Sequence, residues 1–346
     1  MKFFENEVFK KVRSEKYNYD FNKKTGFFAR WGKTLEEDPV YSPIGPEILD
    51  CEITTKCSGI KGKLCKYCYK SNTPSGDNMS LETFKQVVYK VNQYKQLTQV
   101  AFGLGSTAEE NPELWDMCKW LREQGIVPNG TVADISDETA DKISSLFGAC
   151  AISYHGDKDI CYNNVKKLTD RGMKQVNIHF VIYDENFEET LSVFEDIKTD
   201  PRLEKLNALV LLSLKTKGRA KNGNFTKLSQ EKFAYLVEKA FEMNVPLGFD
   251  SCSCNKFLKS IKGRKDEKDL TQLAEGCESF GLFSAYVNVY GQYFPCSFTE
   301  GEPDWKEGFD LTKPINFCKD VWFSDRINMY RKKSLKYNRD CILFDV

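Results

Sequence analysis

Three cysteines stand within the short stretch CSGIKGKLCKYCYK at positions 57–70. Seven residues lie between Cys57 and Cys65, two lie between Cys65 and Cys68, and Tyr67 directly precedes the last thiol. Cysteine clusters in a reducing compartment more often bind metal or do redox chemistry than form disulfides. A structural zinc ion would need a fourth ligand, for which Cys51 is nearest. A four-iron cluster on three thiolates would instead leave one iron open to a small molecule. Plain buried thiols are the third interpretation.

A second group of cysteines follows residue 250. Its members are Cys252, Cys254, Cys277, Cys296, Cys318 and Cys341. Within CESFGLFSAYVNVYGQYFPC (277–296), the pattern predicts a β-hairpin that turns near Gly291. The cysteines that fall inside strand or helix patterns are expected to be small buried hydrophobic residues; they are Cys51, Cys118, Cys150 and Cys161.

Short apolar runs alternate with amphipathic segments between residues 47 and 249. The strands and helices that this alternation predicts form the framework that holds the first cysteine loop. Strands are predicted at 47–54, 98–104, 125–132, 149–154, 174–183, 206–214 and 245–249. Helices are predicted at 81–97, 112–124, 136–147, 158–171, 187–199 and 228–243. Such a pattern is typical of a parallel sheet with helices packed outside it. The cysteine loop follows the first strand, so it lies at the carboxyl edge, where barrels of this type place their chemistry.

The predicted fold class is α/β, with a partial (β/α)6 TIM-like barrel followed by a small α+β cysteine-rich domain. Residues 1–46 are an N-terminal extension in which YNYDFNKKTGFFARWG (17–32) predicts a hairpin. Residues 47–249 form the barrel, and residues 250–346 form the cysteine-rich domain.

Composition excludes several classes of function. Fifty basic and fifty acidic side chains give a formal net charge of zero, so no overall positive field attracts nucleic acid. No apolar run reaches the length of a transmembrane helix, and the charged N-terminus is unlike a signal peptide. We therefore expect a cytoplasmic protein without a membrane partner, whose thirteen cysteines do not form a disulfide framework.

The first cysteine loop resembles the signature of the radical S-adenosylmethionine (radical SAM) superfamily, C-x3-C-x-aromatic-C. The segment CKYC matches its second half, while the spacing between Cys57 and Cys65 is four residues longer than the pattern. Glycines and lysines in SGIKGKL fit a tolerated loop insertion. The resemblance implies that Cys57, Cys65 and Cys68 hold a [4Fe–4S] cluster that binds S-adenosylmethionine.

The same resemblance implies further cofactor contacts on the barrel. FGLGSTAEENPELW (102–115) stands where the family carries a Gly-Gly-Glu-like segment, with Ser106 or Thr107 at the glutamate position. Ser153 is expected to bind the cofactor's ribose or carboxylate, and Asn177 and His179 are expected to face it from one side of their strand. The full set of implied cofactor-binding residues is Tyr67, Gly103, Gly105, Ser106, Thr107, Ser153, Asn177, His179 and Arg219. Ordinary structural roles are the alternative for each.

The C-terminal cysteines resemble the auxiliary-cluster domains called SPASM and, in shorter form, twitch. Cys277, Gly291 and Cys296 fit the C-x9–15-G-x4-C element, and DVWFSDRINMYR (320–331) resembles the tryptophan-containing helix of these domains. One auxiliary [4Fe–4S] cluster is therefore expected on Cys252, Cys277, Cys296 and Cys341. Cys254 and Cys318 are the alternates, and zinc at the same thiols is the other interpretation.

A radical SAM enzyme reductively cleaves S-adenosylmethionine to a 5′-deoxyadenosyl radical, which abstracts a hydrogen atom from the substrate. By resemblance we expect modification of a peptide or protein, by crosslink, thioether or oxidation, with the auxiliary cluster accepting an electron and Asp250 accepting a proton. The alternatives are a small-molecule dehydrogenase or epimerase, and a degenerate metal-binding or scaffold protein. An electron donor such as flavodoxin or ferredoxin is the implied partner.

Overall fold

The structure is a computed structural model that describes residues 1–344. Within these residues the main sheet has ten strands, in the order β11-β10-β9-β8-β7-β6-β5-β12-β13-β14. Neighbours from β5 to β11 are parallel and follow the order of the chain. Their bounds are β5 (Ile48–Glu52), β6 (Gln99–Gly103), β7 (Val127–Val132), β8 (Ala149–Ser153), β9 (Val176–Ile182), β10 (Ala208–Ser213) and β11 (Leu247–Phe249). The fold is mixed α/β with a large parallel sheet, as predicted.

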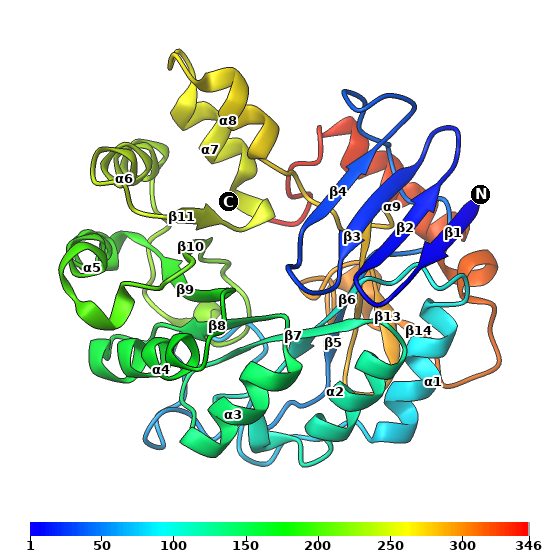
Figure 1. Ribbon diagram of the computed structural model, residues 1–346, viewed down its shortest axis with the longest axis horizontal. Coiled ribbons are helices and arrows are strands. Elements are labelled where there is room, and N and C mark those ends of the chain that lie inside the picture. Colours follow the sequence, from blue (N-terminus) through cyan, green and yellow to red (C-terminus); the bar gives the residue numbers. More distant parts are fainter. Residues whose placement is uncertain (345–346) are drawn as a thin grey trace.

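A helix follows each of the strands β5 to β10. These helices are α1 (Leu81–Val91), α2 (Leu114–Glu123), α3 (Asp137–Leu146), α4 (Lys158–Asp170), α5 (Phe187–Thr199) and α6 (Gln230–Glu242). Serine side chains cap three of them at Ser80, Ser136 and Ser229, each accepting a hydrogen bond from a backbone N–H in the first turn. Figure 1 shows the helices as an outer arc around the strands.

The two faces of the parallel sheet differ in character. On β5, Leu49 and Cys51 are completely buried in the core that the helices cover. Because successive side chains of a strand point to opposite faces, Asp50 and Glu52 lie on the other side, which we call the inner face. Small residues lie beside them on the neighbouring strand β6, where Ala101 pairs with Asp50 and Gly103 pairs with Glu52.

A four-stranded antiparallel sheet precedes the parallel one: β1 (Lys2–Glu5), β2 (Phe9–Arg13), β3 (Asn18–Asn22) and β4 (Phe28–Trp31). The predicted hairpin is confirmed as β3 and β4, whereas β1 and β2 were not predicted. Lys10 of β2 is almost fully buried, and its Nζ donates to the carbonyl of Leu97, just before β6, at 2.7 Å. This sheet therefore packs against the amino ends of the parallel strands.

The last hundred residues continue the main sheet. β12 (Ser284–Val287) pairs in parallel with β5, while β13 (Gln292–Phe294) and β14 (Phe309–Asp310) add to it in antiparallel fashion. The hairpin predicted near Gly291 is confirmed as β12 and β13. Three α-helices and a π-helical turn accompany these strands within the described residues: α7 (Cys254–Ile261), α8 (Glu267–Leu273), the π-helical turn at Phe317–Trp322 and α9 (Asp325–Lys336). Residues 345–346, the end of the predicted auxiliary domain, lie outside the described residues.

The helix predicted at 320–331 is interrupted. Its first part belongs to the π-helical turn, and the regular helix α9 begins only at Asp325, where the Ser324 side chain caps it. Trp322 is completely buried and donates from Nε1 to the carbonyl of Ser42 at 2.9 Å. Across residues 1–344, none of the helices combines the length and the apolar character that a membrane span requires.

Candidate metal centres

The first cysteine loop leaves β5 at the carboxyl edge of the sheet and is held by backbone bonds. Cys57 N donates to the carbonyl of Thr73 at 2.9 Å. Ile60 and Lys63 exchange hydrogen bonds of 3.1 and 2.9 Å, which closes a tight turn inside the long Cys57–Cys65 spacing. The additional residues are therefore folded back on themselves, and the spacing does not force Cys57 away from the other two thiols.

Cys57, Cys65 and Cys68 are all partly buried free thiols. The pKa of Cys65 is raised to about 12, mainly by burial; the neighbouring Cys68 and Cys57 contribute to this rise, and Arg219 opposes it. The electrostatic influence of both other thiols on Cys65 places the three in one neighbourhood. A metal that binds here has to displace the thiol protons.

Tyr67 links the cysteine loop to the carboxyl end of β8. Its hydroxyl donates to the carbonyl of Tyr154 at 3.0 Å and lies 3.1 Å from Nδ1 of His155, and the Tyr67 and His155 rings stack at 5.8 Å. Ser153 is the last residue of β8 and directly precedes Tyr154 and His155, the two residues that Tyr67 contacts.

The glycine-rich segment packs against the same loop. A Cβ at Gly103 would lie 2.9 Å from Cα of Glu52, and one at Gly105 would lie 2.5 Å from the carbonyl oxygen of Lys56. Both positions therefore need glycine for close approach. Thr107 immediately precedes the short 3-10 turn Ala108–Glu110.

Glu110 is a residue that the sequence interpretation missed. It accepts hydrogen bonds from the Ser58 backbone N–H at 2.7 Å and from the Ser106 hydroxyl at 3.3 Å. It therefore ties the glycine-rich segment to the residue that follows Cys57. The signal was available in the adjacent acidic pair of STAEEN, Glu109 and Glu110.

Three basic residues after β10 contact the cysteine-bearing segments, and we call residues 215–219 the basic strap. Arg219 donates from Nε to the Cys65 carbonyl and from Nη1 to the Asn72 carbonyl, both at 2.8 Å. Lys217 donates to the carbonyls of Phe298 and Glu300 at 2.9 and 2.7 Å. The third residue, Lys215, forms a buried ion pair with Asp250. One short segment thus contacts both the loop of Cys65 and the chain after Cys296.

Gly218 of the basic strap offers a test of this packing. Its φ is +58°, and a Cβ there would lie 2.3 Å from the carbonyl oxygen of Tyr69. Gly62 is the matched control, because its φ is +75° but nothing lies within 4 Å. We expect Gly218→Ala to lower the free energy of unfolding by about 1–3 kcal/mol more than Gly62→Ala, because only Gly218 is overpacked. Urea denaturation of both variants measures this, and equal losses would contradict the packing.

The four predicted auxiliary cysteines also share one neighbourhood. A hydrogen bond from Cys252 lowers the pKa of Cys341 to about 6 and raises that of Cys252. Burial raises the pKa of Cys277 to about 11 and that of Cys296 to about 12, with Cys341 contributing to both shifts. Cys252 and Cys341 line a cavity of about 350 Å³.

The alternates for this site are placed differently. Burial alone raises the pKa of Cys318 to about 12, and its thiol donates to the carbonyl of Ile44. Burial raises the pKa of Cys254; Arg339 opposes this rise, whereas Asp340 and Glu275 add to it. No other thiol affects either residue. The four cysteines expected to be buried hydrophobic residues, Cys51, Cys118, Cys150 and Cys161, are confirmed in that role.

Within residues 1–344, the donor sets do not form a compact site for a single metal ion. Within the described residues, no three histidine, cysteine, aspartate or glutamate side chains converge closely enough to hold one metal ion. The Nη2 atom of Arg219, next to Cys65, is buried without a hydrogen-bond partner in the described chain, and an anionic group bound at the thiols would supply acceptors.

The two predicted residues of β9, Asn177 and His179, lie at different distances from the cysteine loop. Burial lowers the pKa of His179 to about 4 despite the opposing charge of Asp250, so this imidazole is neutral at pH 7. Its Nδ1 lies 3.4 Å from the Thr131 hydroxyl. Asn177 lies near the amino end of β9 and accepts from Asn207 at 2.8 Å, at the opposite end of the strand from the cysteine loop. The structure therefore does not bring Asn177 to the cysteines.

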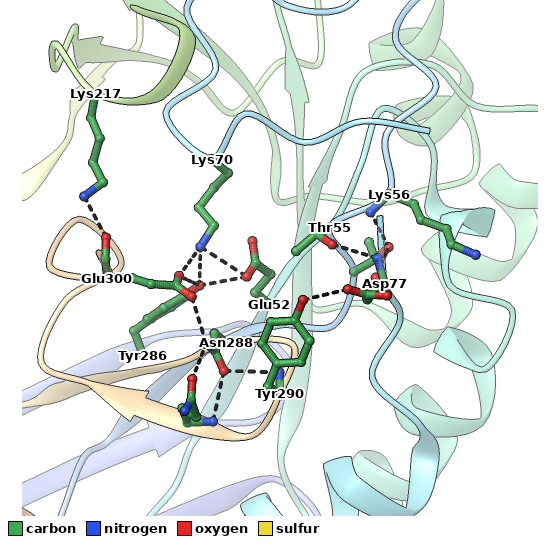
Figure 2. A network of polar contacts seen from close by, with 12 residues as sticks. Glu52, Thr55, Lys56, Lys70, Asp77, Lys217, Tyr286, Asn288, Tyr290 and Glu300 are labelled. Atoms are coloured by element: carbon green, nitrogen blue, oxygen red, sulfur yellow. Dashed lines mark hydrogen bonds and ion pairs between the residues drawn. The ribbon is translucent and has the colours of Figure 1, made fainter. Parts of the chain in front are cut away.

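A buried ionic network, not predicted from the sequence, connects the two cysteine-bearing regions (Figure 2). Lys70, two residues after Cys68, lies 3.1 Å from Glu52 and forms an ion pair with Glu300. The Tyr286 hydroxyl accepts from Lys70 at 2.7 Å and lies within 3.0 Å of both carboxylates. Burial raises the pKa of Glu52, with Lys70 opposing the shift.

Comparisons with known proteins give only distant likenesses. No protein-family model matches the chain, and no curated protein matches it either. Among solved structures, BtrN in complex with AdoMet and 2-DOIA has a TM-score of 0.42 at 12% identity, covering 83% of this chain and 86% of BtrN. An HpcH/HpaI aldolase from Desulfitobacterium hafniense has a TM-score of 0.35 at 9% identity, covering 62% and 83% of the two chains. Similarity of this size does not assign an activity.

Proposed function

We propose that this chain is a radical SAM enzyme with one auxiliary iron–sulfur cluster. The observation that carries the proposal is the grouping of Cys57, Cys65 and Cys68 in one neighbourhood at the carboxyl edge of a parallel sheet. Three thiolates leave one iron of a four-iron cube without a protein ligand. We also propose that the parallel strands form a partial barrel and that the cysteine-bearing segments close its open side.

Cys57, Cys65 and Cys68 would hold the first cluster, and Cys252, Cys277, Cys296 and Cys341 the auxiliary one. With S-adenosylmethionine bound and one electron from an external carrier, the first cluster would supply methionine and a 5′-deoxyadenosyl radical able to remove a substrate hydrogen atom. The residues of the chain bind and orient the reactants and exclude water. A low-potential carrier such as flavodoxin or ferredoxin is the proposed electron donor.

The proposed cofactor contacts use the residues at the carboxyl edge of the sheet. Tyr67 and Ser153 come from neighbouring positions there, and Gly103 and Gly105 bring the backbone of the second βα loop against the cysteine loop. The unpartnered Nη2 of Arg219 is suited to an anionic group near Cys65. Ser106, Thr107 and His179 remain proposed contacts.

Asp250 is the proposed proton acceptor from the substrate. Its carboxylate is paired with Lys215 and accepts a hydrogen bond from the Ser253 hydroxyl. The Ser253 hydroxyl in turn lies 2.7 Å from that of Ser213. These contacts hold Asp250 in one orientation beside Cys252, so a proton could be taken up at a fixed carboxylate.

Two substrate classes are proposed. The inner face of the sheet, with its acidic side chains beside small residues, favours a small polar molecule that is dehydrogenated. A peptide or protein side chain, modified by crosslink, thioether formation or oxidation, is the second candidate, since a side chain can enter the same space.

Anaerobic purification and metal analysis test the proposal. We expect a brown protein with about eight irons and eight sulfides per chain, which corresponds to two four-iron clusters. A colourless protein that contains zinc would contradict the proposal and support a non-catalytic metal-binding protein.

A further inference from the structure

Lys215 is a buried cation at the carboxyl edge of the main sheet. It follows the last residue of β10 by two positions, and the residue is only 7% exposed. Its ammonium group forms an ion pair with Asp250, whose side chain is 18% exposed. Burial opposes the charge of Lys215, but Asp250 and two neighbouring thiols raise its pKa above the ordinary value for lysine. The side chain therefore carries a positive charge at pH 7.

Two contacts place the Lys215 ammonium between segments that carry the proposed auxiliary ligands. Its ion-pair partner Asp250 precedes Cys252 by two residues. On another side, Nζ of Lys215 lies 5.4 Å from the centre of the Phe298 ring. Phe298 follows Cys296 by two residues. The ammonium thus lies where the segments of these two cysteines meet.

The positive charge of the pair has the larger influence on the auxiliary thiols. A hydrogen bond with Cys341 and burial dominate the pKa of Cys252 and raise it. The Lys215 ammonium opposes this rise, and its effect on Cys252 exceeds that of the Asp250 carboxylate. After the hydrogen bond from Cys252, which dominates, Lys215 also contributes to the low pKa of Cys341. Negative charge at these sulfurs is therefore stabilised by the ion pair as a whole.

Stability of the fold does not by itself account for a charged pair in this place. Replacing a buried ion pair by apolar side chains of similar volume is often neutral or stabilising, because desolvating both charges offsets their attraction. A cation beside an iron–sulfur cluster has a specific effect instead. Reduction adds one negative charge to the cluster, which a nearby positive charge stabilises, and local charge is one determinant of cluster potential.

We infer that Lys215 raises the reduction potential of the auxiliary cluster and so makes it a better acceptor of the electron that leaves the substrate. One electron passes from the substrate radical to the cluster, while no bond to Lys215 forms or breaks and its protons stay in place. Lys215 acts through space on the cluster and is not a catalytic residue. The inference rests on the proposed function for the presence of the auxiliary cluster, but not for the radical reaction.

A redox titration followed by electron paramagnetic resonance tests the inference on the anaerobically purified full chain. Cys65→Ala is the parent protein, because only the auxiliary cluster is expected to remain in it. In this parent, Lys215→Met should lower the midpoint potential by about 59 mV or more, which is a tenfold smaller equilibrium constant for a one-electron reduction. Lys215→Arg keeps the charge and should retain most of the parent potential. Lys166→Met is the matched control, because Lys166 pairs with Asp170 on the exposed surface of α4; it should leave the potential unchanged.

Asp250→Asn is an independent variant with the opposite expected sign. Removing the carboxylate leaves the Lys215 ammonium uncompensated, so the potential of the auxiliary cluster should rise. Thermal unfolding verifies that each variant is folded. If Lys215→Met does not fold, the Asp250→Asn variant decides: a higher potential supports the inference, and an unchanged or lower potential overturns it.

Three results would overturn the inference: an unchanged potential in Lys215→Met, an equal drop in Lys215→Arg and Lys215→Met, or no iron at the auxiliary thiols. An unchanged potential in Lys215→Met, together with release of 5′-deoxyadenosine by the native protein, would overturn the inference and leave the proposed function supported. A lowered potential in Lys215→Met, with no release of 5′-deoxyadenosine by the native protein, would support the inference and refute the proposed radical reaction.

Discussion

Replacing Cys65 by alanine is expected to remove half of the bound iron and to abolish the release of 5′-deoxyadenosine. Cys65 lies between the other two thiols of its loop, and both Cys57 and Cys68 influence it. Loss of groups that only support a metal ligand costs about 10–100-fold in affinity or activity, so loss of a ligand should exceed a hundredfold. Iron analysis should fall from about eight to about four per chain, because the auxiliary thiols remain.

Cys161→Ala is the matched control for this variant. Cys161 is a buried free thiol of α4 and belongs to neither cysteine group. It should retain all of the iron and the activity of the native protein. A Cys65→Ala protein with full iron content would show that Cys65 is not a ligand.

Replacing Arg30 by methionine is expected to cost about 3–5 kcal/mol of folding free energy. The Arg30 side chain is 6% exposed, and its Nη1 contacts Glu47 at 2.7 Å and Glu278 at 3.1 Å, while Nη2 pairs with Glu275. Glu47 is 1% exposed, and burial raises its pKa. Removing the arginine leaves the buried Glu47 carboxylate without a cation and disconnects β4 from Glu275 and Glu278, which precede β12. The midpoint of urea unfolding measures the loss.

Arg171→Met serves as the control for Arg30. Arg171 pairs with Asp137 and Asp141 on the surface, where both carboxylates are exposed. Such pairs contribute about 0–1 kcal/mol, so this variant should unfold near the native midpoint. A loss below about 1 kcal/mol for Arg30→Met as well would contradict the stabilising role of the buried cluster.

Local patterns in the sequence predicted the alternation of strands and helices because each element carries its own periodicity. The strand of Ile48–Glu52 is an example, since its apolar Leu49 and Cys51 alternate with Asp50 and Glu52. The same alternation placed Asp50 and Glu52 on one face, although the ion pair of Glu52 with Lys70 was not predicted. The strands β1 and β2 escaped prediction because β1 is exposed and β2 carries three basic residues.

Contacts between distant parts of the chain could not be predicted. Lys70 and Glu300 are 230 residues apart, and neither position carries a local signal for the other. Parallel pairing of β12 with β5 is equally long-range and was missed, while the β12–β13 hairpin was found from its turn. Arg219 was expected at the cofactor, but two of its donors hold backbone carbonyls of the cysteine loop.

The central claim is that the first cysteine loop supports reductive cleavage of S-adenosylmethionine. The most direct measurement is to reduce the anaerobically purified protein with dithionite in the presence of S-adenosylmethionine and to quantify 5′-deoxyadenosine and methionine by mass spectrometry. Our account predicts that both products form in the native protein and in Cys161→Ala, and that neither forms in Cys65→Ala. A native protein that carries both clusters but releases no 5′-deoxyadenosine would contradict it.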